Sequence, residues 1–179
     1  YGVLTAPGTN AGYLAVDSPT KTPGEDFELT VSVDQEPGEH FTIADVIVHY
    51  DPEKLEFDTV SAGGSAALAE EAIESLLPSF GIATAVKENL GQIRVIMSAA
   101  EANALSGDSP LFTLHGKVKD DAAVGSTIVS LSNFETSYNG AHTVMDLSAA
   151  SVSLQIANVD KSQLSAAITD AQQLHDNAV

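Results

Sequence analysis

The clearest hydrophobic pattern in this chain lies in residues 44–61, ADVIVHYDPEKLEFDTVS. Polar and apolar residues alternate from Asp45 to Tyr50, and this alternation predicts a strand with one buried side. Ile47 interrupts the pattern, because it places an aliphatic side chain on the solvent side between Asp45 and His49. An alternating strand buries one side only, so we expect Asp45, Ile47 and His49 to belong to an outer surface.

A turn and a second apolar face follow this strand. Pro52, within residues 51–54 (DPEK), fixes φ near the value that the second position of a type I turn needs. Leu55, Phe57 and Val60 then begin another strand. Similar strands are predicted at residues 13–16, 27–33, 82–87, 93–98, 110–118, 127–131 and 149–156. Short strands separated by turn signals predict an all-β fold, a nine-stranded antiparallel β-sandwich with jelly-roll topology.

Helical spacing is confined to a few segments. Residues 65–77 carry apolar residues three and four positions apart with glutamates opposite them, which predicts a short inserted amphipathic helix that Pro78 ends. Residues 99–105 have the composition for a helical turn or two. Residues 160–163 (DKSQ) have capping-box spacing before an apolar stripe, so a C-terminal helix is predicted over 158–179. Residues 1–12, rich in Gly, Thr and Pro, are expected to be a linker or N-terminal extension.

The charge balance removes several classes of partner. Among 179 residues, 7 are Lys or Arg and 25 are Asp or Glu, which gives a formal net charge of −18. Such a surface repels phosphate groups, so nucleic acid and anionic lipid are disfavoured as partners. No apolar run approaches the roughly 20 residues of a membrane span, so membrane insertion is not expected. Cysteine is absent, and the sequence therefore offers no thiolate metal site.

No catalytic or metal-binding motif stands out. The histidines (His40, His49, His115, His142 and His175) are scattered and lack the paired spacing of metal ligands. Among the many carboxylates, none is marked by apolar neighbours as a catalytic acid of a glycosidase pair. The sequence also contains no nucleophile-elbow motif and no phosphate-binding loop. The sequence therefore predicts a non-catalytic module without a cofactor.

Three segments together resemble the cohesin family of jelly-roll modules that bind dockerin domains. They are residues 50–63 with Tyr50-Asp51-Pro52, residues 22–27 (TPGEDF) and residues 111–119 (LFTLHGKVK). The resemblance covers roughly residues 13–157. It implies a protein–protein interaction module whose partner is a dockerin-containing protein. Any calcium is then expected in the dockerin.

The resemblance also implies a binding face made by the third, fifth, sixth and eighth strands, with an acidic or amide residue early in the third strand as a frequent anchor. Asp45 stands at that place. Carried over by position and strand parity, the expected dockerin-binding residues are Asp45, Ile47, His49, Ala83, Ala85, Arg94, Ile96 and Ser98. The predicted helix over 65–77 departs from the simplest cohesins, so partner specificity does not transfer.

Residues 158–179 resemble the first helix of a FIVAR module, a helical unit found in large secreted bacterial glycoside hydrolases and surface proteins. Both chain ends are expected to be internal points of a longer polypeptide. The expected setting is a multimodular carbohydrate-active enzyme or cellulosome-like scaffold that is secreted, extracellular or on the bacterial cell surface.

Two alternatives stay open. A carbohydrate-binding module could share this sandwich, but such modules favour exposed aromatic platforms. This chain has no Trp and 6% aromatic residues. Phe27, Phe57 and Phe112 are predicted to be internal, which leaves Tyr1, Tyr13 and Tyr138 as candidate exposed rings. The other alternative is a spacer that positions a catalytic module and binds nothing.

Overall fold

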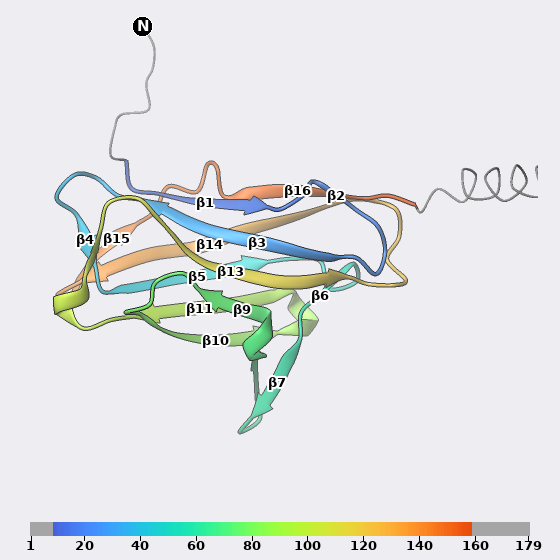
Figure 1. Ribbon diagram of the computed structural model, residues 1–179, viewed down its shortest axis with the longest axis horizontal. Helices are drawn as coiled ribbons and strands as arrows, with labels where there is room; N and C mark the ends of the chain where they lie inside the picture. The colour runs from blue at the N-terminus through green and yellow to red at the C-terminus, as the bar shows by residue number, and fades with distance from the viewer. Residues whose placement is uncertain (1–8, 159–179) are drawn as a thin grey trace, which may run out of the picture.

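The computed structural model describes residues 9–158, which fold into two sheets that enclose a common core (Figure 1). In the five-stranded sheet, neighbouring strands run antiparallel. It consists of β1 (Ala11–Val16), β3 (Asp26–Asp34), β13 (Ser109–Val118) and β6 (Leu55–Glu56) in that order, with β9 (Ile73–Ser75) also paired to β13.

The nine-stranded sheet forms the other layer. Its order is β2 (Thr20–Lys21), β16 (Ser151–Ile156), β14 (Gly125–Tyr138), β5 (Ile43–His49), β11 (Gln92–Ser98), β10 (Gly81–Lys87), β8 (Ser65–Leu68) and β7 (Thr59–Ala62), with β15 (Ala141–Val144) paired to β14. The short strands β4 (His40–Phe41) and β12 (Leu105–Ser106) pair separately, and single 3₁₀ turns occur at Glu70–Ala72, Glu88–Leu90 and Glu101–Asn103. The predicted all-β sandwich is confirmed, although β2 and β16 pair in parallel and the described residues divide into more and shorter strands than nine.

The core lies between the inward-facing residues of the two sheets. Along β3 buried and partly exposed residues alternate, and β5 and β11 repeat this alternation. Phe27 and Phe112 are buried in the five-stranded sheet, and Phe134 is buried in the other. The rings of Phe27 and Phe57 meet edge to face with centroids 5.5 Å apart, a favoured aromatic geometry. Burial of one side of each strand leaves the opposite side free for function.

The predicted helix over residues 65–77 is wrong. This segment instead forms β8, a 3₁₀ turn at Glu70–Ala72, and β9. Gly63 and Gly64 have φ of +60° and +84°, as a type I′ hairpin requires, so β7 and β8 pair in a hairpin that projects from the sandwich (Figure 1). An isolated helix of this length is marginal in water, and β10 and β13 offer the extended backbone hydrogen-bond partners. The apolar residues are still buried, among them Leu68, Ala72 and Leu77.

Several predicted boundaries also change. β1 begins at Ala11, two residues before the predicted strand, and β14 extends from Gly125 to Tyr138 rather than over 127–131 alone. The strand β15 was not predicted. Val60 is 51% exposed and does not continue the apolar face of Leu55 and Phe57. Residues 1–8 and 159–179 lie outside the described part, and with them nearly all of the predicted C-terminal helix.

Candidate protein-docking face

The predicted binding residues lie on one outer face of the nine-stranded sheet. In β5, Ala44, Val46 and Val48 are buried against the core, so the alternate residues Asp45, Ile47 and His49 face outward. The antiparallel register places Arg94 of β11 opposite Ile47, and Ile96 opposite Asp45. Residues directly opposite each other share a face of the sheet. The alternation of polar and apolar residues therefore predicted correctly which side of β5 faces outward.

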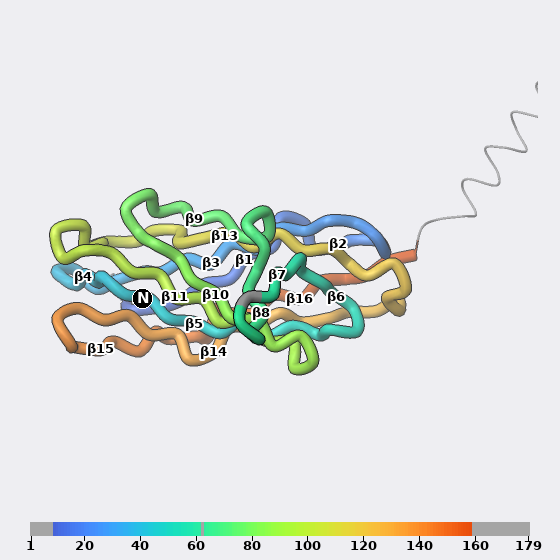
Figure 2. Tube along the Cα trace, turned by 90° about the horizontal axis from the view of Figure 1, so that it is seen from below, coloured from blue at the N-terminus to red at the C-terminus, as the bar shows by residue number. Residues whose placement is uncertain are grey.

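The same register extends the face to β10. Ala83 lies opposite Ile96, Ala85 lies opposite Arg94, and Ser98 pairs with both Gly81 of β10 and Ile43 of β5. The four strands β10, β11, β5 and β14 lie side by side (Figure 2). We call the outer surface of the segments in which these four strands pair with one another the docking face. All eight residues predicted for the binding surface belong to it by position.

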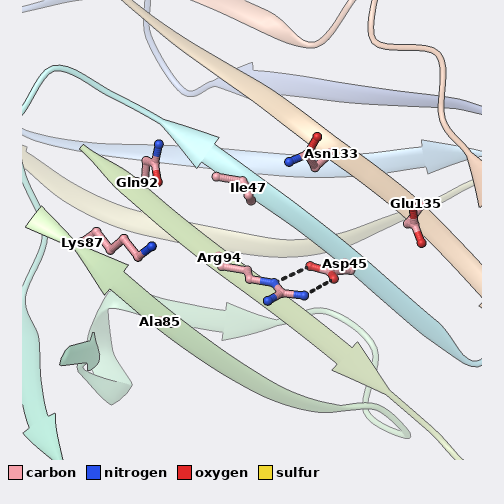
Figure 3. A pocket seen from close by; sticks show the side chains of 8 residues that line it. All are labelled: Asp45, Ile47, Ala85, Lys87, Gln92, Arg94, Asn133 and Glu135. Carbon is pink, nitrogen blue, oxygen red and sulfur yellow. Dashed lines mark hydrogen bonds and ion pairs between the residues drawn. The ribbon is translucent and has the colours of Figure 1, made fainter. Parts of the chain in front are cut away.

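An ion pair occupies the middle of the docking face. The guanidinium of Arg94 donates from Nε to Asp45 Oδ1 at 3.0 Å and from Nη2 to Asp45 Oδ2 at 2.6 Å (Figure 3). This two-point contact is the geometry in which guanidinium and carboxylate match best. The hydrogen bond to Asp45 raises the pKa of Arg94 above its already high value. Both charges are thus compensated before any partner arrives.

The ion pair borders an open hollow of about 500 Å³. Asp45, Ile47, Ala85 and Arg94, all predicted, line this hollow together with Lys87, Gln92, Asn133 and Glu135, which were not predicted. Figure 3 shows these side chains on β5, β10, β11 and β14. His49, Ala83, Ile96 and Ser98 lie on the docking face but do not line the hollow.

Asn133 and Glu135 were missed because the predicted strand ended at residue 131, whereas β14 continues through a β-bulge to Tyr138. The two steps along β5 from Ile47 to Asp45 face three steps along β14 from Ser132 to Glu135, so β14 contains one extra residue. Asn133 has a φ of +48°, in the left-handed region that Asn tolerates better than most residues. The sequence carries one signal for this bulge. The buried residues have odd numbers before it (Val129 and Leu131) and even numbers after it (Phe134 and Thr136), so the alternation shifts by one residue.

Aliphatic and polar side chains surround the ion pair. Ile47 and Ile96 are half-buried, and Ile43, which was not predicted, is 42% exposed at the same face. A ring nitrogen of His49 hydrogen-bonds the Ser132 hydroxyl, and Glu135 Oε1 lies 2.9 Å from His142 Nδ1 of β15. The face therefore combines a partly apolar surface with polar groups that are mostly paired within the protein.

The described residues offer little for sugar or metal binding. Phe27, Phe57 and Phe112 are internal, as predicted. Tyr13 and Tyr138 are only half exposed, and the Tyr138 hydroxyl donates to Glu101, which raises its pKa. Within residues 9–158, no group of three or more His, Asp or Glu side chains is arranged to hold a metal ion. No helix in this part of the chain is long and apolar enough to cross a membrane.

The fold and its docking face define a β-sandwich interaction module. Residues 13–156 match the Cohesin domain family, and the chain belongs to that family, which comprises non-catalytic protein-interaction modules. The family assignment confirms the resemblance to cohesins seen in the sequence.

Comparisons with individual proteins agree with this assignment. A gellan lyase from a Bacillus species is 44% identical over 176 residues, which cover 94% of this chain but only 7% of that protein. Among solved structures, the cohesin module of a family 33 glycoside hydrolase from Clostridium perfringens has a TM-score of 0.65 at 16% identity, covering 84% of this chain and 100% of that one. A type I cohesin–dockerin complex from Clostridium thermocellum gives a TM-score of 0.61 at 18% identity, with coverage of 83% and 100%.

Proposed function

We propose that the docking face binds a dockerin domain and so joins the polypeptide that carries this module to a dockerin-bearing protein. The observation that carries the proposal is the convergence of Asp45, Ile47, Ala85 and Arg94 around one hollow. These residues come from three strands, and the family resemblance selected them by position and parity. The module itself acts as a binding partner and not as a catalyst.

The chemistry of the face suits a protein interface. Stable interfaces combine an apolar centre, where most of the binding energy concentrates, with a polar rim that remains hydrated. Ile43, Ile47 and Ile96 supply exposed or half-exposed aliphatic surface, and the Asp45–Arg94 pair supplies directional hydrogen-bonding groups. The internal pairing of these charges lowers the cost of removing water from them when a partner docks.

The proposal extends to the setting of the module. The chain spans 7% of the gellan lyase that it matches, which supports a place within a much larger polysaccharide-degrading enzyme. Within the carbohydrate-active enzymes expected from the sequence, this match favours a polysaccharide lyase as the parent over a glycoside hydrolase. We place this polypeptide outside the cell or on its surface. Residues 158–179 are proposed to begin a FIVAR-like helical module, on the strength of their capping box and apolar stripe.

Carbohydrate binding is the alternative function. Flat sugar-binding faces stack pyranose rings on exposed aromatic side chains, since such rings offer a large apolar surface. The residues that line the hollow include no aromatic ring. The docking face therefore favours a protein partner over a polysaccharide.

Calorimetric titration of the module with dockerin-bearing proteins of its own organism tests the proposal. We expect saturable one-to-one binding with at least one dockerin in the presence of calcium. Removal of calcium with a chelator should abolish that binding and leave the thermal unfolding of the module unchanged, because the ion is expected in the dockerin. Heat with gellan or another polysaccharide, and none with any dockerin, would replace the proposal with the alternative.

A further inference from the structure

One basic group at the hollow has no carboxylate partner among residues 9–158. Arg94 forms an ion pair with Asp45, and the fourth charged residue of the lining, Glu135, is hydrogen-bonded to His142. Lys87 is exposed at the end of β10, and no described carboxylate lies within 4 Å of its ammonium group. Lys87 also makes no hydrogen bond to another described side chain. Figure 3 shows its ammonium group directed into the hollow.

Lys87 differs in this respect from Arg94, the other basic residue at the hollow. Of the six basic residues in the described part of the chain, Lys21, Arg94 and Lys117 have a carboxylate partner, and Lys54, Lys87 and Lys119 have none. Lys87 lies opposite Gln92, and Ala85 lies opposite Arg94, so Lys87 and Arg94 are diagonal neighbours on one face. Diagonal neighbours on adjacent strands lie about 7–8 Å apart, a spacing that one carboxylate can bridge.

Arg94 also has donors to spare. A guanidinium group carries five N–H donors, and two of those on Arg94 reach Asp45. The remaining donors of Arg94 and the ammonium group of Lys87 belong to the same hollow, which Ile47 also lines. Charges separated by more than about 8–10 Å of water and salt are largely screened. The charged side chains that line the hollow therefore affect a bound carboxylate more than the net charge of −18 does.

We propose that the dockerin partner places an aspartate or glutamate side chain in the hollow, where its carboxylate binds Lys87 and the remaining N–H groups of Arg94. This inference rests on the proposed function of the docking face. An interface that covers Lys87 without a counter-ion leaves a desolvated charge unpaired, which is strongly unfavourable. Lys87 is thus a specificity residue. It favours dockerins with an acid at the matching position and disfavours dockerins with a basic residue there.

The test uses Lys87→Glu with Lys119→Glu as its matched control. Lys119 follows β13, outside the docking face, and the two substitutions change the net charge equally. The probe is the dockerin that binds the wild-type module in the titration above. We expect Lys87→Glu to weaken its binding about 10- to 100-fold, and Lys119→Glu to weaken it no more than about 3-fold, at physiological salt. Thermal unfolding of both variants checks that the fold is intact.

A charge exchange identifies the partner residue. Each acidic residue of the dockerin surface other than its calcium ligands is replaced by Lys and titrated against Lys87→Glu. Recovery of most of the lost affinity by one such variant supports the inference. Equal weakening by Lys87→Glu and Lys119→Glu, with wild-type binding intact, overturns this inference alone. Failure of the wild-type module to bind any dockerin overturns the proposed function as well.

Discussion

The carboxylate of Asp45 meets the guanidinium of Arg94 at two points, with donor–acceptor distances of 3.0 Å and 2.6 Å. The two residues are diagonal neighbours on β5 and β11, and their side chains remain 26% and 53% exposed. The pair neutralises the centre of the docking face in a chain with a net charge of −18. A partner therefore meets an ordered pair of hydrogen-bonding groups and not an isolated charge.

Substitution of Asp45 should weaken dockerin binding more than it weakens the fold. We expect Asp45→Ala to cost about 1–3 kcal/mol of binding free energy, because it removes a desolvated hydrogen-bonding group and leaves Arg94 uncompensated. The stability of the module should change by less than about 1 kcal/mol, since the pair is partly exposed. Calorimetry and urea unfolding measure the two effects.

The double variant Asp45→Ala/Arg94→Ala provides the control for this prediction. Its binding loss should be smaller than the sum of the two single losses, because the partners act as a unit. Strict additivity of the single losses would show that the pair does not act as a unit in docking.

The bulge in β14 should depend on the conformation of Asn133. Asn133→Gly should leave stability within about 0.5 kcal/mol of the wild type, because Gly adopts its φ of +48° without strain. Asn133→Val should lose about 1–2 kcal/mol, since a β-branched residue is strained in the left-handed region. Denaturant unfolding of both variants distinguishes the effect of conformation from that of the side-chain amide. Equal stability of the two would contradict the assigned bulge.

Gly91 should be essential for stability, because it packs directly against Tyr50 and Pro52 at the start of the turn at residues 51–54. Its carbonyl accepts the N–H of Tyr50 at 2.9 Å, and its φ is +63°. A Cβ at this position would collide with the Tyr50 carbonyl and lie 2.9 Å from Cδ of Pro52. We expect Gly91→Ala to lower the free energy of unfolding by more than about 2 kcal/mol, because steric overlap adds to backbone strain.

Gly107→Ala is the matched control for Gly91→Ala. Gly107 has a φ of +79°, but a Cβ added to it would meet no described atom within 4 Å. This variant should lose only the conformational cost of about 1–2 kcal/mol. Comparable losses at both positions, measured by urea unfolding, would mean that the contact with Tyr50 relaxes at little cost.

Asp17 should make part of the stability dependent on pH. Burial acts to raise the pKa of Asp17, but hydrogen bonds from the Glu28 and Ser18 N–H groups and from Lys21 outweigh it and lower the pKa below the usual value of about 3.9. A lowered folded-state pKa stabilises the protein above the unfolded-state pKa, and this contribution is lost as the pH falls through the folded-state value.

The comparison of wild type with Asp17→Asn checks this prediction. The wild type should be the more stable at pH 7, and the difference in unfolding free energy should shrink as the pH falls below about 4. A difference that stays constant from about pH 7 to about pH 3 would show that ionisation of Asp17 does not contribute.

The parts of the fold whose burial alternates regularly could be predicted from the sequence. Val46 and Val48 face the core in β5, and their alternation with polar residues is enough to orient Asp45 and Ile47 outward. The turn at residues 51–54 was predicted for a local reason, since Pro52 is suited to it, and the Lys54 N–H bonds the Asp51 carbonyl at 3.1 Å.

Features that depend on tertiary contacts were missed. Residues 65–77 have helical spacing but form strands, because they pair with β10 and β13, which lie further along the chain. Asn133 and Glu135 reached the hollow through a one-residue insertion that reverses strand parity. Lys87 lay within a predicted strand, but its lack of a counter-ion among the described residues is visible only once the surrounding charges are placed.

The most direct measurement of the central claim is dockerin affinity after a charge is introduced at Ile47, compared with the same change at Ile128. Ile128 is 64% exposed in the same sheet, but it precedes the segment of β14 that pairs with β5 and lies opposite Ser153 of β16, outside the docking face and its hollow. We predict that Ile47→Asp weakens dockerin binding at least about 30-fold, as expected for the centre of an interface, while Ile128→Asp stays within about 2-fold of the wild type. Wild-type affinity of a folded Ile47→Asp variant, or equal weakening by both substitutions, would contradict the assignment of this face as the dockerin site.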